Sequence, residues 1–454
     1  MKRNTFTFGI GTIGRDMLYS LISMFLIFYL TDVLHLPDNM ILWLTGIMVA
    51  ARVFDAVNDP IMGVIVDNTR TRFGKFKPWI AGGALASGIF TVLLFTDFGW
   101  RGAPFIIVFS VIYLLWGISF TANDISYWSM LPSLTTNQSQ REKMGSFARI
   151  CANVGMFAVV AGIEPITDAL NQNIGSMPKT YMYLAIGIVV IMILGQSVTV
   201  FGVREPKGVF KKESSTTLKD MVKVIFKNDQ LLVVAIAMVL FMIGYVTTTS
   251  FGLYFFKYAY GDEGMFSFFA LIVGVCQILG LAVFPLFSKK FTRRQLYTGG
   301  TILVVAGYLM FFFAPMKMIP IGIAGVLLFI GQSFIQILML MFLADSIEYG
   351  QWKLGRRNES VTFALQPFIN KMSGALASGI VGLTVVFSGM NTAESAADMT
   401  PQGLLIMKTA MMFIPLIFIV VGYIIYMKKY KIDKTLFNKI LSDLRERGDI
   451  KDEK

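Results

Sequence analysis

The sequence contains very little histidine and cysteine for its length. Its 454 residues include one histidine, His35, and two cysteines, Cys151 and Cys276, each inside an apolar segment. These counts exclude a Ser-His-Asp triad, a multi-histidine metal site, a disulfide framework and a four-cysteine metal site. With no nucleophile–base pair or metal set left, we expect neither an enzyme nor a bound cofactor.

Charged residues are also scarce, at 15% of the chain, whereas soluble domains average about 25%. Hydrophobic residues make up 55%, and the mean hydropathy is +0.65. The deficit of charge argues against a soluble enzyme. A net charge of +12 would by itself fit a nucleic-acid-binding protein, but the chain has too little polar surface for one. We therefore expect no nucleic-acid partner.

Twelve apolar runs dominate the chain, each about as long as the 20 residues that cross a bilayer as a helix. They are too long for strands and are not broken by clusters of turn residues, so we expect helices. The runs cover roughly residues 8–35, 40–66, 79–98, 103–130, 144–164, 181–203, 230–258, 265–288, 296–315, 318–345, 359–388 and 402–427. The fold class predicted is an all-α membrane protein, with the lipid bilayer as its environment.

The basic residues are distributed unevenly between the two sides of the predicted membrane. Of the 40 Lys and Arg residues, 31 lie in the N-terminus, the even-numbered connections and the C-terminal tail. Cytoplasmic connections of membrane proteins are enriched in Lys and Arg, so both termini are predicted to be cytoplasmic. An even number of spans agrees with this, and the net positive charge is explained by topology.

The longest connection divides the chain into two six-helix halves. The predicted domains are 1–203, a cytoplasmic loop 204–229, 230–427 and a cytoplasmic tail 428–454, which is helical and too short for a regulatory domain. The halves also resemble each other, since a proline, a basic loop and a Gly-Gly pair follow in the same order after the second and the eighth span. Two such repeats are typical of the major facilitator fold, and we expect the chain to function as a monomer.

Eight ionisable residues fall inside the predicted spans. Each costs about 2.5–3.5 kcal/mol at the centre of a bilayer, so the set would cost about 20 kcal/mol if all faced lipid. We therefore expect them to face one another or a water-filled cavity. They are Asp16, Asp55, Asp59, Asp124, Arg15, Arg52, Arg149 and Lys371.

The second span carries two carboxylates on one helical face. Asp55 and Asp59 are four residues apart, with Asn58 beside them. Two like charges this close disfavour each other unless a cation lies between them, and hard cations prefer oxygen ligands. The pattern predicts a coupling-ion site for Na⁺ or a proton. The alternative is a structural Arg52–Asp55 ion pair, with Asp59 at a kink before Pro60.

The fourth span combines a carboxylate with an indole on one face, which also carries Thr121. The carboxylate of Asp124 can accept two hydroxyl hydrogen bonds, and the ring of Trp128 can stack on the C–H side of a sugar. In the fifth span, Arg149 can fork onto sugar hydroxyls or pair with Asp16 or Asp124. We predict a sugar site here; the alternative is an interfacial tryptophan near a structural aspartate.

The eleventh span is unusually polar for a membrane helix. Thr362, Gln366 and Asn370 recur every four residues, Lys371 follows Asn370, and Pro367 is expected to bend the helix. This stripe predicts the lining of a cavity. Lys371 can tether the acidic half of that cavity to the other half.

The loop after the second span is rich in charge and predicts part of a cytoplasmic gate that pairs with the other half. Glu359, at the start of the eleventh span near the cytoplasmic face, is also assigned to the gate; alternatively it is an interface charge paired with Arg356 or Arg357. The predicted gate residues are Asp67, Arg70, Arg72, Lys75 and Glu359.

Three segments resemble a known family of transporters. They are DAVNDP at 55–60 with the loop 67–79, DISYWSMLP at 124–132 with residues 141–149, and ADSIEYGQ at 344–351 with residues 366–371. Together they resemble the glycoside–pentoside–hexuronide:cation symporters, a bacterial branch of the major facilitator superfamily. Within that family the chain is most similar to galactoside permeases of the lactose and melibiose kind.

The resemblance implies roles for individual residues. It implies a cation site at Asp55, Asn58, Asp59, Thr121 and Asp124. It implies a substrate site at Asp16, Arg15, Asp124, Trp128, Arg149 and Lys371, to which the polar stripe adds Gln366 and Asn370. Some lactose permeases of the family carry a histidine where this chain has Arg356, so proton coupling through that position is absent. Na⁺ at Asp55 and Asp59 remains open, as does a proton there.

These observations predict a symporter of the bacterial cytoplasmic membrane. We expect it to carry a galactoside-like oligosaccharide such as lactose, melibiose or raffinose, together with Na⁺ or H⁺, by alternating access. A pentoside, a glucuronide or a sulfonated sugar is an alternative substrate. A lipid transporter of the same fold and a sugar sensor that does not transport are the rival functions.

Overall fold

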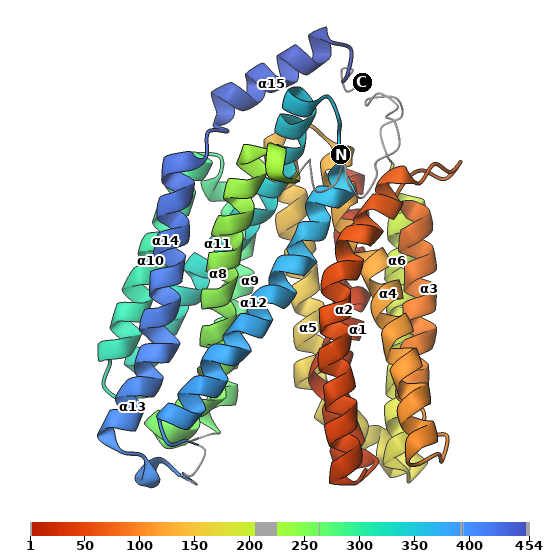
Figure 1. Cartoon of the computed structure of the whole chain (residues 1–454), viewed down its shortest axis with the longest axis vertical. Coiled ribbons are helices and arrows are strands. Elements are labelled where there is room, and N and C mark those ends of the chain that lie inside the picture. Colours follow the sequence, from red (N-terminus) through yellow and green to blue (C-terminus); the bar gives the residue numbers. More distant parts are fainter. Residues whose placement is uncertain (1, 205–224, 263, 391–392, 394, 451–454) are drawn as a thin grey trace. The chain divides into compact units, whose positions relative to one another are not determined.

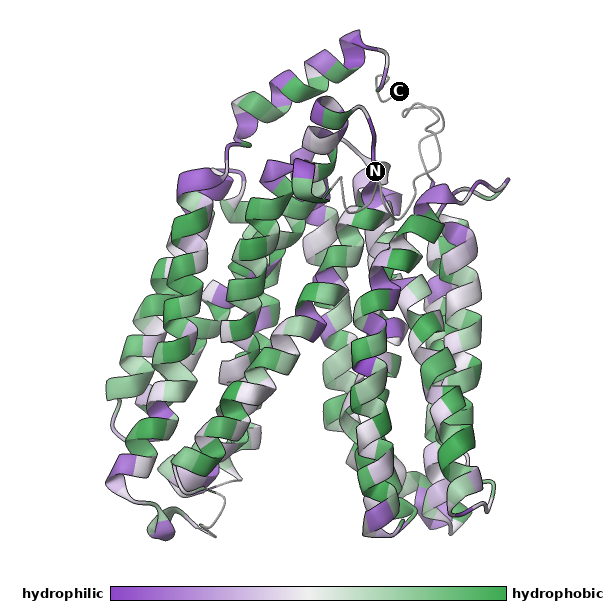
Figure 2. Ribbon diagram, viewed as in Figure 1, coloured by the Kyte–Doolittle hydropathy of each residue, from purple (hydrophilic) through white to green (hydrophobic). Residues whose placement is uncertain are grey.

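The computed structural model describes residues 2–204, 225–262, 264–390, 393 and 395–450. Within these residues, twelve helical segments are long and apolar enough to cross a membrane, so the predicted all-α membrane fold is confirmed. Apolar residues predominate along these helices, whereas polar residues gather at helix ends and on α15 (Figure 2). Residues 205–224 of the predicted central loop and 451–454 of the predicted tail lie outside the described residues.

The backbone contacts divide the described chain into two compact units. Residues 2–204 and 358–364 form unit 1, and residues 225–357 and 365–450, with the gaps given above, form unit 2. The helix over Glu359–Phe387 is therefore shared, since its first residues pack in unit 1. The sequence alone instead predicts that the whole of this helix lies in the C-terminal half. The predicted boundary between the two halves, within residues 204–229, stays a prediction.

Unit 1 contains six long helices joined by short connections (Figure 1). Hydrogen bonds bring the start of the first helix to the end of the sixth, because Arg3 Nε donates to Gly202 O at 2.9 Å and Asn4 Nδ2 donates to Arg204 O at 2.9 Å. The helices are α1 (Lys2–Phe28, continued by the π-helix η1, Tyr29–Val33), α2 (Asp38–Asn68), α3 (Lys77–Leu94), α4 (Ala103–Leu134), α5 (Gln138–Ile174) and α6 (Met177–Gly202).

Unit 2 has a corresponding series of helices and a short C-terminal one. Two of its membrane segments include π-helical turns. The elements are α8 (Asp229–Tyr254) with η2 (Phe255–Tyr260), α9 (Met265–Phe287), α10 (Arg293–Phe313), α11 (Met318–Leu354), α12 (Glu359–Phe387), η3 (Ala396–Asp398), α13 (Pro401–Lys408) with η4 (Thr409–Phe413) and α14 (Ile414–Lys429), and α15 (Lys434–Glu446).

Helix α5 begins six residues before the predicted apolar run because polar groups stabilise its first turns. Asn137 caps the helix, its Oδ1 accepting from Gln140 N at 3.2 Å. Arg141 is fully buried and donates to the carbonyl oxygens of Thr135 at 2.7 Å and Pro132 at 3.0 Å. A search for apolar runs stops at such charged residues, although their donors are satisfied inside the protein.

Helix α11 likewise continues nine residues beyond its predicted end at 345. Asp345 and Glu348 are buried, and each pairs with an arginine: Asp345 with Arg293, and Glu348 with Arg357 at 3.1 Å. Gln351 Oε1 also accepts from Arg357 Nη1 at 3.2 Å. These pairs let acidic residues lie on a buried helix face.

Close approaches hold α1 against its neighbours in unit 1. A Cβ atom at Gly155 of α5 would lie 2.2 Å from Ile13 O, so only glycine fits where α5 meets α1. Two turns earlier on α5, Ala148 O accepts from Thr12 Oγ1 at 2.9 Å. The first and fifth helices of unit 1 are thus in direct contact along their length.

A buried chain of amide hydrogen bonds positions α4 in unit 1. Asn123 Nδ2 donates to Ile80 O of α3 at 2.7 Å and to Gln196 Oε1 of α6 at 3.1 Å. Gln196 Nε2 in turn donates to Gly11 O of α1 at 2.6 Å. Four helices are linked at the depth of Asn123, which fixes the rotation of α4 beside the next residue, Asp124.

Candidate functional site

A buried arginine in α1 joins two carboxylates of unit 1. Arg15 Nη2 lies 2.8 Å from Asp16 Oδ2, and Arg15 Nη1 lies 3.1 Å from Asp124 Oδ1 in α4. The Arg15 side chain is 3% exposed, while those of Asp16 and Asp124 are 27% and 23% exposed. The buried arginine therefore neutralises both acids, and each carboxylate keeps exposed surface that a hydroxyl-rich ligand can reach.

Aromatic rings surround this charged group. The Arg15 guanidinium carbon lies 4.9 Å from the Tyr127 ring centroid and 5.2 Å from that of Trp128, and Phe8 stacks on Tyr127 at 4.5 Å. Arg149 of α5 lies 4.5 Å from the Trp128 ring centroid. The structure thus brings Arg15, Asp16, Asp124, Trp128 and Arg149 together: Arg15 pairs with both carboxylates, and Arg149 lies over the indole face.

The two carboxylates of α2 face α4 with matched spacing. Thr121 Oγ1 donates to Asp59 Oδ1 at 3.1 Å, and Asp59 is fully buried. One turn away, a Cβ atom at Gly117 would lie 3.2 Å from Asp55 Oδ1. Asp55 and Asp59 therefore face Gly117 and Thr121, two residues that are also four apart.

This arrangement supplies oxygen atoms for a hard cation. Carboxylates and a threonine hydroxyl are the ligand types that Na⁺ accepts, and either carboxylate can instead take a proton. Asn58 lies between the two acids in sequence, and within the described part of the chain its buried Nδ2 has no hydrogen-bond acceptor. An amide without an acceptor can turn its oxygen toward a cation instead.

The charged loop after α2 holds the start of α12, and all the residues involved belong to unit 1. Asp67 accepts backbone hydrogen bonds from Ser360 N at 3.1 Å and Val361 N at 3.0 Å, so it caps the first turn of α12. Lys75 Nζ lies 2.6 Å from Asp67 Oδ1 and 3.2 Å from Glu359 Oε2. The predicted gate residues Asp67, Lys75 and Glu359 therefore form one contact.

The two carboxylates keep the Lys75 ammonium charged. Burial alone would lower its pKa, but the adjacent Asp67 and Glu359 outweigh that effect, and the pKa of Lys75 is raised above its usual value. The remaining predicted gate residues lie on the loop itself. Arg70 donates to the carbonyl oxygens of Asp67 and Thr69, and Arg72 stacks on Phe73 at 4.7 Å.

The predicted substrate residues of α12 belong to unit 2. Gln366 is buried, Lys371 is half-buried and Asn370 is exposed. The Gln366 Oε1 atom is buried without a hydrogen-bond donor among the described residues. That these three residues form one substrate site together with the unit 1 residues stays a prediction.

Several site residues were not singled out from the sequence. Gly117 could have been found from the sequence, because Gly117 and Thr121 are four residues apart, the same spacing as Asp55 and Asp59. Tyr127 had no signal apart from being next to Trp128. The backbone amides of Ser360 and Val361 carry no sequence signal, since any residue supplies an N–H group.

The fold matches solved structures of the major facilitator type. A structure of a proton:xylose symporter bound to 6-bromo-6-deoxy-D-glucose aligns with a TM-score of 0.66 at 14% identity, covering 94% of this chain and 95% of that one. A structure of the E. coli fucose:proton symporter aligns with a TM-score of 0.64 at 12% identity, covering 92% and 97%. At this identity the likeness establishes the fold alone.

The sequence comparisons identify the family. The model for MFS/sugar transport proteins matches residues 7–434. A lactose permease of Lactobacillus delbrueckii subsp. bulgaricus is 30% identical over 96% of this chain and 72% of its own length, and a raffinose carrier protein of Pediococcus pentosaceus is 30% identical over 96% and 70%. An isoprimeverose transporter of Lactiplantibacillus pentosus is 24% identical over 97% and 91%.

This chain belongs to the glycoside–pentoside–hexuronide:cation symporter family, a branch of the major facilitator superfamily. The predicted fold class is confirmed, and so is the predicted resemblance to this family, from which we expected sugar symport. Twelve apolar helices and relatives from bacteria make it a multi-pass bacterial membrane protein.

Proposed function

We propose that the protein imports a galactoside-like oligosaccharide with Na⁺ or H⁺ across the bacterial cytoplasmic membrane. One observation carries the proposal: two candidate sites share one turn of α4. Thr121 contacts Asp59 in the candidate cation site, and Asp124, three residues on, contacts Arg15 in the candidate sugar site. A change at one site thereby reaches the other through a single rigid helix.

The cation acts first on α2. A Na⁺ ion or a proton between Asp55 and Asp59 removes the repulsion between the two carboxylates and fixes the side of α4 that carries Thr121. Asp124 is then held in one geometry, with its exposed carboxylate surface available to sugar hydroxyls. Sugar binding must in turn raise cation affinity by the same factor, because the two equilibria are linked.

The sugar is recognised by the charged and aromatic group of unit 1. Asp16 and Asp124 accept hydrogen bonds from hydroxyls, Arg149 donates to them, and Trp128 offers apolar surface to the C–H side of the ring. Gln366, Asn370 and Lys371 are proposed to complete the substrate site from α12. The cycle consists of binding, alternating access and release, and no covalent bond of the sugar is broken.

The contact of Asp67, Lys75 and Glu359 is proposed to be a cytoplasmic gate. It ties the loop after α2 to the first turn of α12, and it must open when the site faces the cytoplasm. We propose that the N-terminus and the C-terminal tail lie on the same cytoplasmic side, as the distribution of basic residues suggests. We propose that a monomer suffices, because all the residues invoked lie on one chain.

Uptake of radiolabelled sugar into proteoliposomes tests the proposal. A panel of lactose, melibiose, raffinose, a pentoside, a glucuronide and a sulfonated sugar is offered under an imposed Na⁺ gradient, a pH gradient or neither. We expect accumulation of a galactoside above equilibrium under one of the two gradients. Binding without uptake would indicate a sensor. A labelled phospholipid included in the vesicle membrane is followed in parallel, and its movement between leaflets without sugar uptake would indicate a lipid transporter.

A further inference from the structure

Corresponding helices pack differently in the two units. In unit 1 the first and fifth helices, α1 and α5, approach so closely that Gly155 has no room for a Cβ atom. In unit 2 the first and fifth helices are α8 and α12, and a cavity of about 220 Å³ lies between them. The first and fifth helices are therefore in close contact in unit 1 and are separated by a cavity in unit 2.

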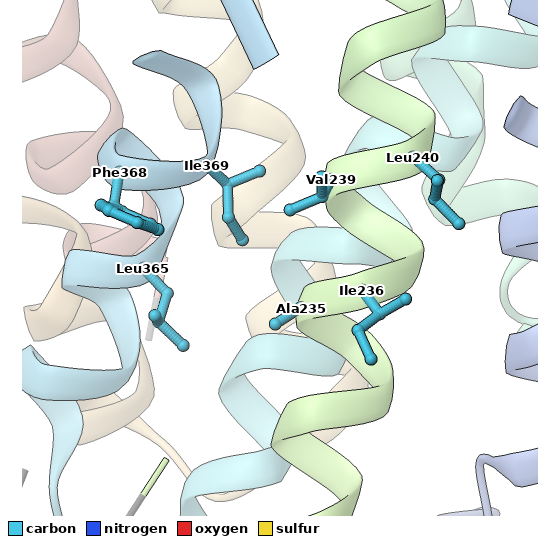
Figure 3. A pocket seen from close by; sticks show the side chains of 7 residues that line it. All are labelled: Ala235, Ile236, Val239, Leu240, Leu365, Phe368 and Ile369. Carbon is cyan, nitrogen blue, oxygen red and sulfur yellow. The ribbon is translucent and has the colours of Figure 1, made fainter. Parts of the chain in front are cut away.

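The cavity is entirely apolar. Figure 3 shows side chains from α8 on one side and α12 on the other, all aliphatic or aromatic. The helices touch at Ser373, whose Oγ donates to Val239 O at 3.3 Å. The lining residues are Ala235, Ile236, Val239, Leu240, Leu365, Phe368 and Ile369. A cavity with such walls excludes water and takes hydrocarbon instead.

Exposed lysines lie near the start of α8. Gln230 Oε1 accepts from Lys431 N at 2.7 Å, and Gln230 Nε2 donates to Lys429 O, which brings the end of α14 beside α8. Lys429 and Lys431 are exposed, as are Lys428 and Lys227. The one acidic group of the first turn of α8, Asp229, is already paired with Lys353.

The distance along α8 connects the lysines with the cavity. The cavity residues of α8 lie 6 to 11 positions after Asp229, about 9–17 Å at 1.5 Å per residue. This is the depth at which a lipid with its phosphate at the helix start places the first half of an acyl chain. Basic side chains at such a boundary attract anionic headgroups.

We propose that the cavity between α8 and α12 binds an acyl chain of an anionic phospholipid whose phosphate is held by the lysines at the start of α8. The lipid is a bound ligand and is not transported. In unit 1 the corresponding space is closed by the direct contact of α5 with α1. In unit 2 the acyl chain occupies it, and it thereby stabilises the separation between α8 and α12. The binding site lies within unit 2, and its α12 residues are neighbours in sequence of those assigned to the proposed sugar site.

Native mass spectrometry of the delipidated full-length protein in detergent tests this. The protein is titrated with phosphatidylglycerol or with phosphatidylcholine, and retained lipid is counted. We expect one phosphatidylglycerol to be retained by the wild type and by Ala282→Trp, an exposed position on α9. Ala235→Trp, which fills the cavity, should weaken its retention at least tenfold.

Two further measurements make the outcome decisive. Val239→Phe fills the same cavity with a smaller change and replaces Ala235→Trp if that variant does not fold. Lys428→Gln/Lys431→Gln should remove the preference for phosphatidylglycerol. Equal retention by the filled variant and Ala282→Trp, or equal retention of the two lipids by the wild type, overturns the proposal. Because the assay measures lipid and not transport, its failure leaves the proposed symport untouched.

Discussion

Arg15 Nη1 lies 3.1 Å from Asp124 Oδ1, so a buried cation of α1 is paired with the carboxylate of α4 on which sugar recognition is proposed to rest. The same guanidinium also binds Asp16. A sugar whose hydroxyls donate hydrogen bonds to these carboxylates has to share them with Arg15. The arginine therefore sets how much negative charge the substrate meets.

Removal of Arg15 is expected to be costly. Arg15→Ala leaves two partly buried carboxylates without their cation, and breaking a buried ion pair costs about 3–5 kcal/mol. We expect a loss of thermal stability in detergent, measured by tryptophan fluorescence, together with loss of sugar binding. Arg15→Lys, which keeps the charge but not the fork, should recover stability more than sugar affinity; equal recovery of both would argue against a positioning role.

Substitution of Asp59 should separate coupling from binding. Asp59→Cys removes a buried acceptor of the Thr121 hydrogen bond and one of two candidate cation ligands. We expect sugar accumulation driven by a cation gradient to disappear in vesicles, while exchange of labelled for unlabelled sugar persists. If the variant still concentrates sugar against a gradient, the cation site lies elsewhere.

Trp128 should matter for the sugar and not for the cation. Trp128→Ala removes the ring that Arg149 contacts and the apolar surface proposed for the sugar. We expect sugar affinity measured by calorimetry to fall at least tenfold, with cation affinity in the absence of sugar changed less than twofold. Retention of normal sugar affinity would contradict this part of the site.

Gly117 provides a test of the cation site that alters no charge. In Gly117→Ala the new Cβ lies 3.2 Å from Asp55 Oδ1, so the carboxylate must shift by a few tenths of an ångström. We expect cation affinity, measured by calorimetry, to weaken about three- to tenfold. Gly187→Ala in α6 is the matched control, because a Cβ there meets nothing within 4 Å; an equal effect in both variants would show that the loss of glycine flexibility is responsible.

The proposed gate should resist alkaline pH. The pKa of Lys75 is raised, so its stabilising contribution is complete below the ordinary lysine pKa of about 10.5 and is lost only as the pH rises through the higher folded value. Alkylation of Ser360→Cys, which reports opening of the first turn of α12, should therefore be slow and independent of any Lys75 titration between pH 6 and 9. Lys75→Gln should accelerate it, whereas Lys290→Gln, at an exposed lysine outside the predicted gate, should not.

The fold was predictable because length and hydropathy leave few other arrangements for twelve apolar runs. The candidate site residues of unit 1 were predictable because a charge inside a membrane must have a partner, and spacing of four puts Asp55 and Asp59 on one helix face. Which partner each charge takes was not predictable: the bridge from Arg15 to both Asp16 and Asp124 depends on helix rotation, set here by the buried Asn123 and Gln196 amides. Contacts made by backbone amides, as at Ser360, cannot be predicted from residue type, because every residue except proline has an N–H group.

The sharing of α12 between the two units has a mechanical consequence. Its first residues, 358–364, pack in unit 1, and the rest pack in unit 2. Three residues past that boundary, Pro367 has no N–H to donate to the carbonyl of Phe363, so the helix lacks one hydrogen bond there. The helix is thus weakened just beyond the point where the two units divide it, and bending at Pro367 would let residues 358–364 and the rest of α12 each keep their own packing.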